Sequence, residues 1–124
     1  MIINTANIKH IYVSSKYTDM RKQIDGLAMI VTSSFNMNVM DHSLFIFTNR
    51  SKTQIKMLYY DYNGFWLFSR KLQKGHFQIF EHNDEDVVEI SDYQLSRLVE
   101  GMIYESEMVP NYNENNSLTS PILI

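Results

Sequence analysis

The chain has 124 residues, no cysteine and a formal net charge of −3. This length fits one domain, and 44% hydrophobic residues can build a core, which excludes wholesale disorder. The lack of cysteine excludes disulfides, thiolate metal sites and a cysteine nucleophile. No apolar run approaches the roughly 20 residues of a membrane helix, and the N-terminal residues lack the layout of a signal peptide. We therefore expect a soluble, cytoplasmic protein.

The charges are divided unevenly along the chain. Residues 1–80 carry ten Lys or Arg and four Asp or Glu, a balance of +6. Residues 81–124 carry one base and ten acids, a balance of −9. This division suggests a surface that faces a polyanion beside an acidic segment. Mutual neutralisation of the two parts in the folded chain is the alternative.

The first part of the chain predicts a strand, a helix and a second strand. Residues 8–14 are rich in β-branched residues and read as a strand. Residues 18–35 read as a helix with Thr18 as its N-cap, because apolar residues recur at steps of three and four. Residues 44–48 are almost wholly apolar, which places this strand near the centre of the sheet.

Residues 54–72 read as a β-hairpin. Two aromatic-rich runs flank Asn63-Gly64, a dipeptide that tolerates the positive φ angles of a tight hairpin turn. With these two residues as the loop, the register makes two pairs: Tyr62 with Phe65, and Lys56 with Lys71. One face then carries Ile55, Met57, Tyr59, Asp61, Trp66, Phe68, Arg70 and Leu72. The other carries Lys56, Leu58, Tyr60, Tyr62, Phe65, Leu67, Ser69 and Lys71.

The last part of the chain adds shorter elements. We expect a strand at 76–80, an acidic loop at 81–86, a strand at 87–90, a helix from Ser91 or Asp92 to about 105, and a flexible polar tail at 107–124. The prediction is a single α+β domain over 1–106. Its sheet is mainly antiparallel, with about five strands and two helices in the order β-α-β-β-β-β-α.

No pattern in the sequence is typical of an enzyme. The histidines lack the spacing of a metal site, and the acidic loop lacks the ligand pattern of a calcium-binding loop. Asp41 and Asp61 lie near strand ends, but a two-magnesium nuclease needs several carboxylates converging from different elements. We expect no catalytic residues, no metal and no cofactor.

The basic and aromatic residues of the hairpin and its surroundings are the remaining candidates for function. Lysines opposite each other are destabilising unless an anion lies between them, and tyrosines on the same face can stack on bases. The candidate DNA-binding residues are Arg21, Lys22, Arg50, Lys52, Lys56, Arg70, Lys71, Lys74, Tyr60 and Tyr62. The alternative is that the aromatics belong to the core and the lysines extend from its edge.

Several ordered motifs resemble a known family. They are Thr18-Asp19-Met20-Arg21-Lys22, Asp25-Gly26-Leu27-Ala28, Phe47-Thr48-Asn49-Arg50, Ile55 to Asp61, Gly64 to Phe68, Arg70-Lys71-Leu72, Lys74 to Phe77, Gln94-Leu95, Leu98 and Glu100-Gly101. Over roughly residues 8–105 the chain resembles the TnpB accessory proteins of insertion sequence family sixty-six. It departs from the family pattern at Tyr60, where tryptophan is common, after Phe77, where a Trp-Pro pair is common, and in its negative net charge.

The resemblance implies a non-catalytic accessory protein for transposition of a bacterial insertion sequence, working beside a separate transposase. The leading hypothesis is that it binds DNA and helps to assemble the transposase on the element ends. Partners would then be the DNA of those ends and the transposase, with no membrane. One alternative is a protein–protein adaptor that binds the transposase without DNA. Another is an acidic tail that shields the basic face until a partner displaces it.

Overall fold

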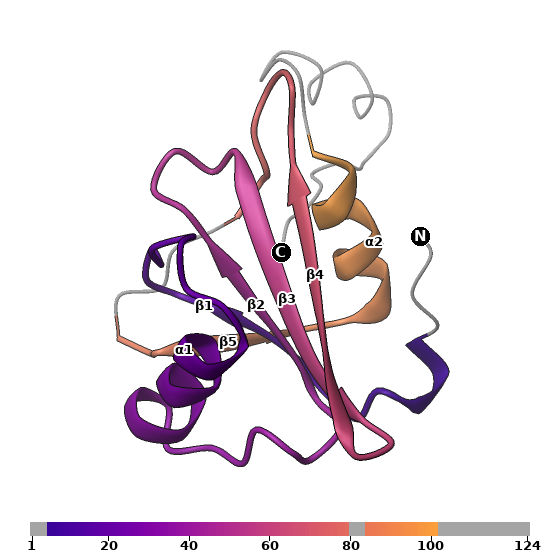
Figure 1. Ribbon diagram of the computed structural model, residues 1–124. Coiled ribbons are helices and arrows are strands. Elements are labelled where there is room, and N and C mark those ends of the chain that lie inside the picture. The colour runs from indigo at the N-terminus through magenta and orange to yellow at the C-terminus, as the bar shows by residue number, and fades with distance from the viewer. Residues whose placement is uncertain (1–4, 80–83, 102–124) are drawn as a thin grey trace.

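A five-stranded sheet forms the centre of the protein (Figure 1). The computed structural model describes residues 5–79 and 84–101. In chain order the elements are a 3₁₀ turn η1 (Thr5–Asn7), β1 (Ile11–Ser14), α1 (Ile24–Met29), a π-helical turn η2 (Ile30–Ser34), β2 (Leu44–Thr48), β3 (Gln54–Asp61), β4 (Gly64–Lys71), β5 (Val87–Ile90) and α2 (Asp92–Glu100). The predicted α+β class and the order β-α-β-β-β-β-α are confirmed.

The strand order is β4-β3-β2-β1-β5. β1 and β2 are parallel and are joined through α1, while the other three neighbouring pairs are antiparallel. A parallel pair needs such a crossover, whereas tight turns join antiparallel neighbours. β2 is the middle strand of the five, as its apolar sequence predicts.

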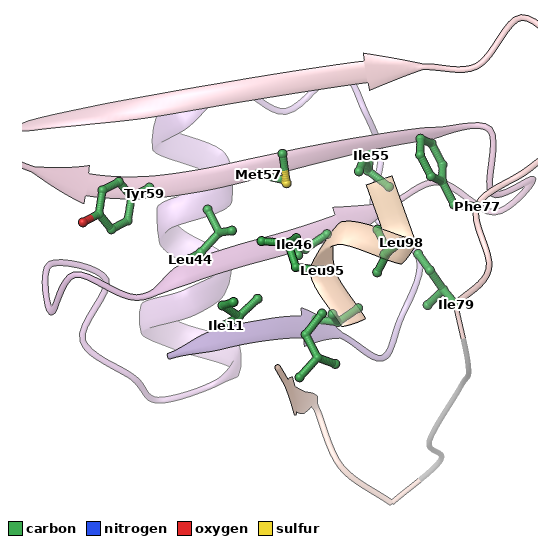
Figure 2. Close-up of a cluster of buried hydrophobic side chains, with 12 residues drawn as sticks. Ile11, Leu44, Ile46, Ile55, Met57, Tyr59, Phe77, Ile79, Leu95 and Leu98 are labelled. Carbon is green, nitrogen blue, oxygen red and sulfur yellow. The ribbon is translucent and has the colours of Figure 1, made fainter. Parts of the chain in front are cut away.

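The side chains of β2 divide the core into two clusters. Leu44 and Ile46 pack with Leu95 and Leu98 of α2 (Figure 2). Phe45 and Phe47 pack in a second cluster with residues of α1 and η2. Because successive side chains of a strand point to opposite faces, α1 and α2 cover opposite faces of the sheet (Figure 1).

The β3–β4 hairpin has a different register from the predicted one. Asp61 pairs with Gly64, so the loop residues are Tyr62 and Asn63, with φ angles of 47° and 68°. Lys56 lies opposite Ser69 and Lys71 lies opposite Gln54, so the predicted Lys56–Lys71 pair is wrong. This register brings the rings of Tyr60 and Phe65 to 5.1 Å between centroids, and such cross-strand aromatic pairs stabilise a sheet.

The predicted division of the hairpin into two faces is nevertheless correct. The register is shifted by two residues, and only an odd shift exchanges the faces of a strand. Met57 and Phe68 belong to the cluster under α2, while Leu58 and Leu67 belong to the cluster under α1.

The first helix begins later than predicted and Thr18 is not its N-cap. The Thr18 amide donates to the Thr48 carbonyl at 2.8 Å, and the Asp19 carboxylate accepts from the Arg21 amide at 2.9 Å. These bonds hold residues 18–21 in a turn beside β2, so α1 starts only at Ile24. After Met29 the helix widens into the π-helical turn η2, in which the Phe35 amide donates to the Ile30 carbonyl.

The strand predicted at 76–80 is not a strand in residues 76–79. His76 makes a single bridge, and the amide of Phe77 donates to the Lys52 carbonyl at 2.7 Å. Phe77 and Ile79 are buried under α2 all the same. Their apolar character reflects packing of an irregular segment, which an apolar run alone does not distinguish from a strand.

The second helix is confirmed at its start and ends earlier than predicted. Ser91 and Gln94 form a capping box, in which each side chain bonds the backbone amide of the other residue. The helix ends at Glu100 because Gly101 adopts a φ of 75°, which favours glycine. A Cβ at Gly101 would lie 2.8 Å from Leu72 Cδ1. The predicted tail at 107–124 lies outside the described residues.

Candidate nucleic-acid interface

Most of the candidate cations lie at one end of the sheet. At this end β2 and β4 finish and β3 begins, so segments distant in the sequence meet (upper end in Figure 1). We call this surface the basic end, and its cations are Lys22, Arg50, Lys52, Arg70, Lys71 and Lys74. All of them are exposed except Lys52, which is half-buried.

A tight turn between β2 and β3 supports the basic end. The side-chain carbonyl of Asn49 accepts from the amides of Thr53 and Gln54, at 2.9 and 3.2 Å. The Lys52 amide donates to the Asn49 carbonyl. Lys52 lies at a φ of 61°, and its Nζ donates to the Ile79 carbonyl at 3.3 Å. The turn therefore fixes the backbone from which Arg50 and Lys52 project.

Arg50 also contacts an aromatic side chain from another segment. Its guanidinium carbon lies 5.0 Å from the ring centroid of Tyr17, within the range of a cation–π interaction. Tyr17 is brought there by the Thr18–Thr48 backbone bond. The contact orients the Arg50 side chain while its charge stays on an exposed residue.

A pocket of about 270 Å³ lies beside this surface, between the end of β1 and η2. Two lysines, Lys16 and Lys22, and two aspartates, Asp19 and Asp86, contribute to its lining. These charges balance, so the pocket itself does not offer net positive charge to a phosphate. The cations on the open surface of the basic end do.

Arg21 is engaged within its own turn. Its guanidinium makes a bidentate contact with the Asp19 carboxylate, with Nη2–Oδ2 at 2.6 Å and Nε–Oδ1 at 3.1 Å. The hydrogen bond from Arg21 holds the pKa of Asp19 well below its ordinary range, and Asp19 in turn raises the pKa of Arg21. The charge of Arg21 is therefore offset locally, unlike the charges of Lys71 and Lys74.

Lys56 is buried, in agreement with the alternative interpretation in which the hairpin lysines extend from the edge of the core. Only 5% of the residue is exposed. Its Nζ donates to the Lys22 carbonyl at 2.8 Å, which ties the turn before α1 to β3. Lys56 is thus a structural residue that helps to place Lys22 at the basic end.

We predict that Lys56→Ala lowers the stability of the protein. It removes a hydrogen bond from a charged donor to the Lys22 carbonyl, a loss of about 2 kcal/mol in the free energy of unfolding. Urea denaturation measures this change. Lys71→Ala is the matched control, because Lys71 is exposed and its loss is expected to change stability by less than about 0.5 kcal/mol. Equal stability of the two variants would contradict the structural role of Lys56.

Tyr60 and Tyr62 do not join the cations. They lie at the hairpin tip, at the opposite end of β3 (lower end in Figure 1). Four residues of strand separate Lys56 from Tyr60, a rise of about 13 Å. Tyr60 packs edge-to-face on Phe65 and His42, whereas Tyr62 is 86% exposed. The structure therefore does not form the single basic–aromatic surface predicted from the sequence.

Two residues near the basic end were not among the predicted site residues. Lys16 is exposed, and Tyr17 supports Arg50. Both directly follow β1, which runs parallel to β2, so the two strands finish at the same end of the sheet. The sequence could have indicated this position. Both residues follow a strand that a helix joins to the next strand, and this β-α-β order produces a parallel pair whose strands finish at the same end of the sheet.

The described ranges, 5–79 and 84–101, contain no group of three or more His, Cys, Asp or Glu side chains able to hold a metal ion. Within the same ranges no helix is long and apolar enough to span a bilayer. Together with the sheet and its basic end, these features define a small α+β protein with a cationic surface.

The chain belongs to the family described as IS66 Orf2 like protein, whose model matches residues 9–108. The protein is therefore of the kind that accompanies transposition of an insertion sequence as an accessory protein, and the resemblance noted from its motifs is confirmed. The chain is similar to "Uncharacterized protein y4hO" of Sinorhizobium fredii (strain NBRC 101917 / NGR234). The two are 30% identical over 102 residues, which cover 82% of this chain and 87% of the relative. No solved structure matches the chain significantly.

Proposed function

We propose that this accessory protein binds DNA through the basic end and helps to assemble the transposase on the ends of the insertion sequence. The observation that carries the proposal is the convergence of six Lys and Arg residues from three stretches of the chain on one end of the sheet. The stretches are the turn before α1, the β2–β3 turn and residues 70–74. The protein itself performs no chemistry in this proposal. Its partners are the DNA of the element ends and the transposase of the same element.

The exposed cations suit contacts with phosphates. Neutralisation of phosphates by Lys and Arg supplies most of the affinity of sequence-independent binding and makes it sensitive to salt. Two aspartates lie near these cations: Asp19 is paired with Arg21, and Asp86 lines the pocket beside Lys22. Asp61 lies at the hairpin tip, at the other end of β3. A chain with a net charge of −3 can therefore still present a positive surface.

Fluorescence anisotropy tests the proposal with the full chain, a labelled duplex from the element end and a scrambled duplex of equal length. We expect micromolar or tighter binding that weakens steeply between about 50 and 200 mM salt. Tighter binding to the element end would add sequence recognition to the contacts with phosphate. Absence of binding to both duplexes at 50 mM salt would refute the proposal.

A second candidate function is that of an adaptor that binds the transposase without DNA. Large apolar side chains are exposed in the described structure, among them Met29 at 62% and Met40 at 52%. Methionine and aromatic residues are enriched in protein–protein interfaces. A pull-down with purified transposase in the absence of DNA tests this candidate, because an adaptor must form a complex under those conditions and failure to form one would refute it.

A further inference from the structure

β4 forms one edge of the sheet, and in the described structure no strand lies against its outer side (Figure 1). It has eight residues and contains no proline. Its only charged residues are Arg70 and Lys71 at the C-terminal end. Long edges without charge or proline offer unpaired backbone groups to another strand, and proteins usually protect them.

The hairpin loop determines which backbone groups point outward. A two-residue loop makes Asp61 and Gly64 a hydrogen-bonded pair, and the following pairs alternate. The amide of Leu72 donates to the Thr53 carbonyl at 2.8 Å, which continues the same alternation. The amides and carbonyls of Phe65, Leu67 and Ser69 therefore point away from β3.

An aromatic pair lies along the same edge. Trp66 is 57% exposed, and its ring stacks on Phe68 with 6.1 Å between centroids and 14° between planes. Phe68 packs against the cluster under α2, whereas Trp66 extends beyond it. The pair thus has one ring fixed by the core and one ring open to a further partner.

Opposite charges occupy the two ends of this face. Asp61 and Arg70 lie on the same face of the hairpin, the first beside the tip and the second near the basic end. Within one molecule the six residues from Gly64 to Arg70 separate them by about 20 Å, too far for an ion pair. An antiparallel second copy would place the Arg70 of one molecule at the tip of the other.

We propose that a second copy of this chain pairs with β4 in antiparallel fashion, with Leu67 opposite the partner's Leu67. The two sheets then join into one sheet of ten strands. In this register the outward amides and carbonyls of Phe65, Leu67 and Ser69 bond to those of the partner's Ser69, Leu67 and Phe65. The proposal does not depend on DNA binding.

The same register accounts for the side chains of the edge. Trp66 lies opposite the partner's Phe68 in a pair without backbone hydrogen bonds, where side chains approach most closely. Arg70 lies opposite the partner's Gly64. Because that glycine has no side chain, the guanidinium can extend across it to the partner's Asp61, two strand spacings or about 10 Å away between Cα atoms.

Sedimentation equilibrium of the full chain and its charge variants tests this dimer. We expect a monomer–dimer equilibrium that Arg70→Glu or Asp61→Lys alone weakens about tenfold or more, because each puts like charges together twice by symmetry. The double variant restores dimerisation, and Lys74→Glu leaves it unchanged as a control of equal charge. Wild-type protein that stays monomeric at 100 micromolar, or a double variant no better than the single ones, overturns the proposal.

A cysteine variant tests the register independently. The chain has no cysteine, so any thiol cross-link in Leu67→Cys forms through the introduced residue. Opposed residues of a hydrogen-bonded pair have Cα atoms about 5.5 Å apart, a separation that a short bis-maleimide reagent spans. Covalent dimer is expected for Leu67→Cys and not for Ser96→Cys on the exposed side of α2. If the full chain is a monomer and Trp66 becomes exposed only in a variant that lacks residues 102–124, then the chain's own C-terminal residues cover β4. That result would also overturn the proposal.

Discussion

Simultaneous replacement of Arg50, Lys71 and Lys74 by alanine is expected to weaken DNA binding about 100-fold or more at 0.1 M salt. All three residues are exposed; Arg50 lies in the β2–β3 turn, Lys71 ends β4, and Lys74 follows three residues later. If each neutralises one phosphate, the slope of log K against log salt falls by about 2.7, since each contact contributes about 0.9. Anisotropy titrations at four salt concentrations measure both quantities. The loss should be similar for the element end and a scrambled duplex, because phosphates carry no sequence information.

Lys9→Ala combined with Arg97→Ala is the control for general charge. Both residues are exposed, and neither belongs to the basic end, since Lys9 precedes β1 and Arg97 lies on α2. We expect less than a threefold change in affinity and a nearly unchanged salt slope for this control, because distant exposed charges are screened. A folded triple variant with wild-type affinity and slope would exclude the basic end as the DNA-binding surface.

The fold was predictable where burial alone decides the structure. The apolar run of residues 44–48 identified the central strand because β2 is covered on both faces. Alternation along residues 54–72 assigned the hairpin faces, and that assignment survived a wrong register because the shift was even. The register itself depends on which pairs of side chains fit together, as in Tyr60 against Phe65. A turn dipeptide alone does not contain that information.

The sequence identified most of the cations of the candidate site, but it did not show which side chains share one surface. Arg50, Lys52, Lys71 and Lys74 meet because β2, β3 and β4 follow one another through short turns. Lys56 has the same charge in the sequence, but strand alternation turns its side chain under α1, where its Nζ donates a hydrogen bond to the Lys22 carbonyl. Tyr60 and Tyr62 lie on the same strand or its turn, yet strand length alone separates them from the basic end.

Phe77→Ala is expected to lower the free energy of unfolding by about 3–5 kcal/mol, the usual cost of removing a buried phenyl ring. Phe77 is fully buried in the cluster under α2, although its segment is not a strand. Its amide also bonds the Lys52 carbonyl at 2.7 Å, which joins residues 76–79 to the turn of the basic end. Small domains are stable by only about 5–15 kcal/mol, so this single change removes a large part of the total.

Urea denaturation followed by circular dichroism measures the effect of Phe77→Ala. Tyr62→Ala is the matched control, because it also removes an aromatic ring, but from a side chain that is 86% exposed, and is expected to change stability by less than about 0.5 kcal/mol. The dependence on urea should keep its slope, which reports the surface exposed on unfolding. A loss below 1 kcal/mol for Phe77→Ala would contradict the packing of residues 76–79 against α2. A large loss would show that an irregular segment anchors the core as firmly as the strand expected in its place.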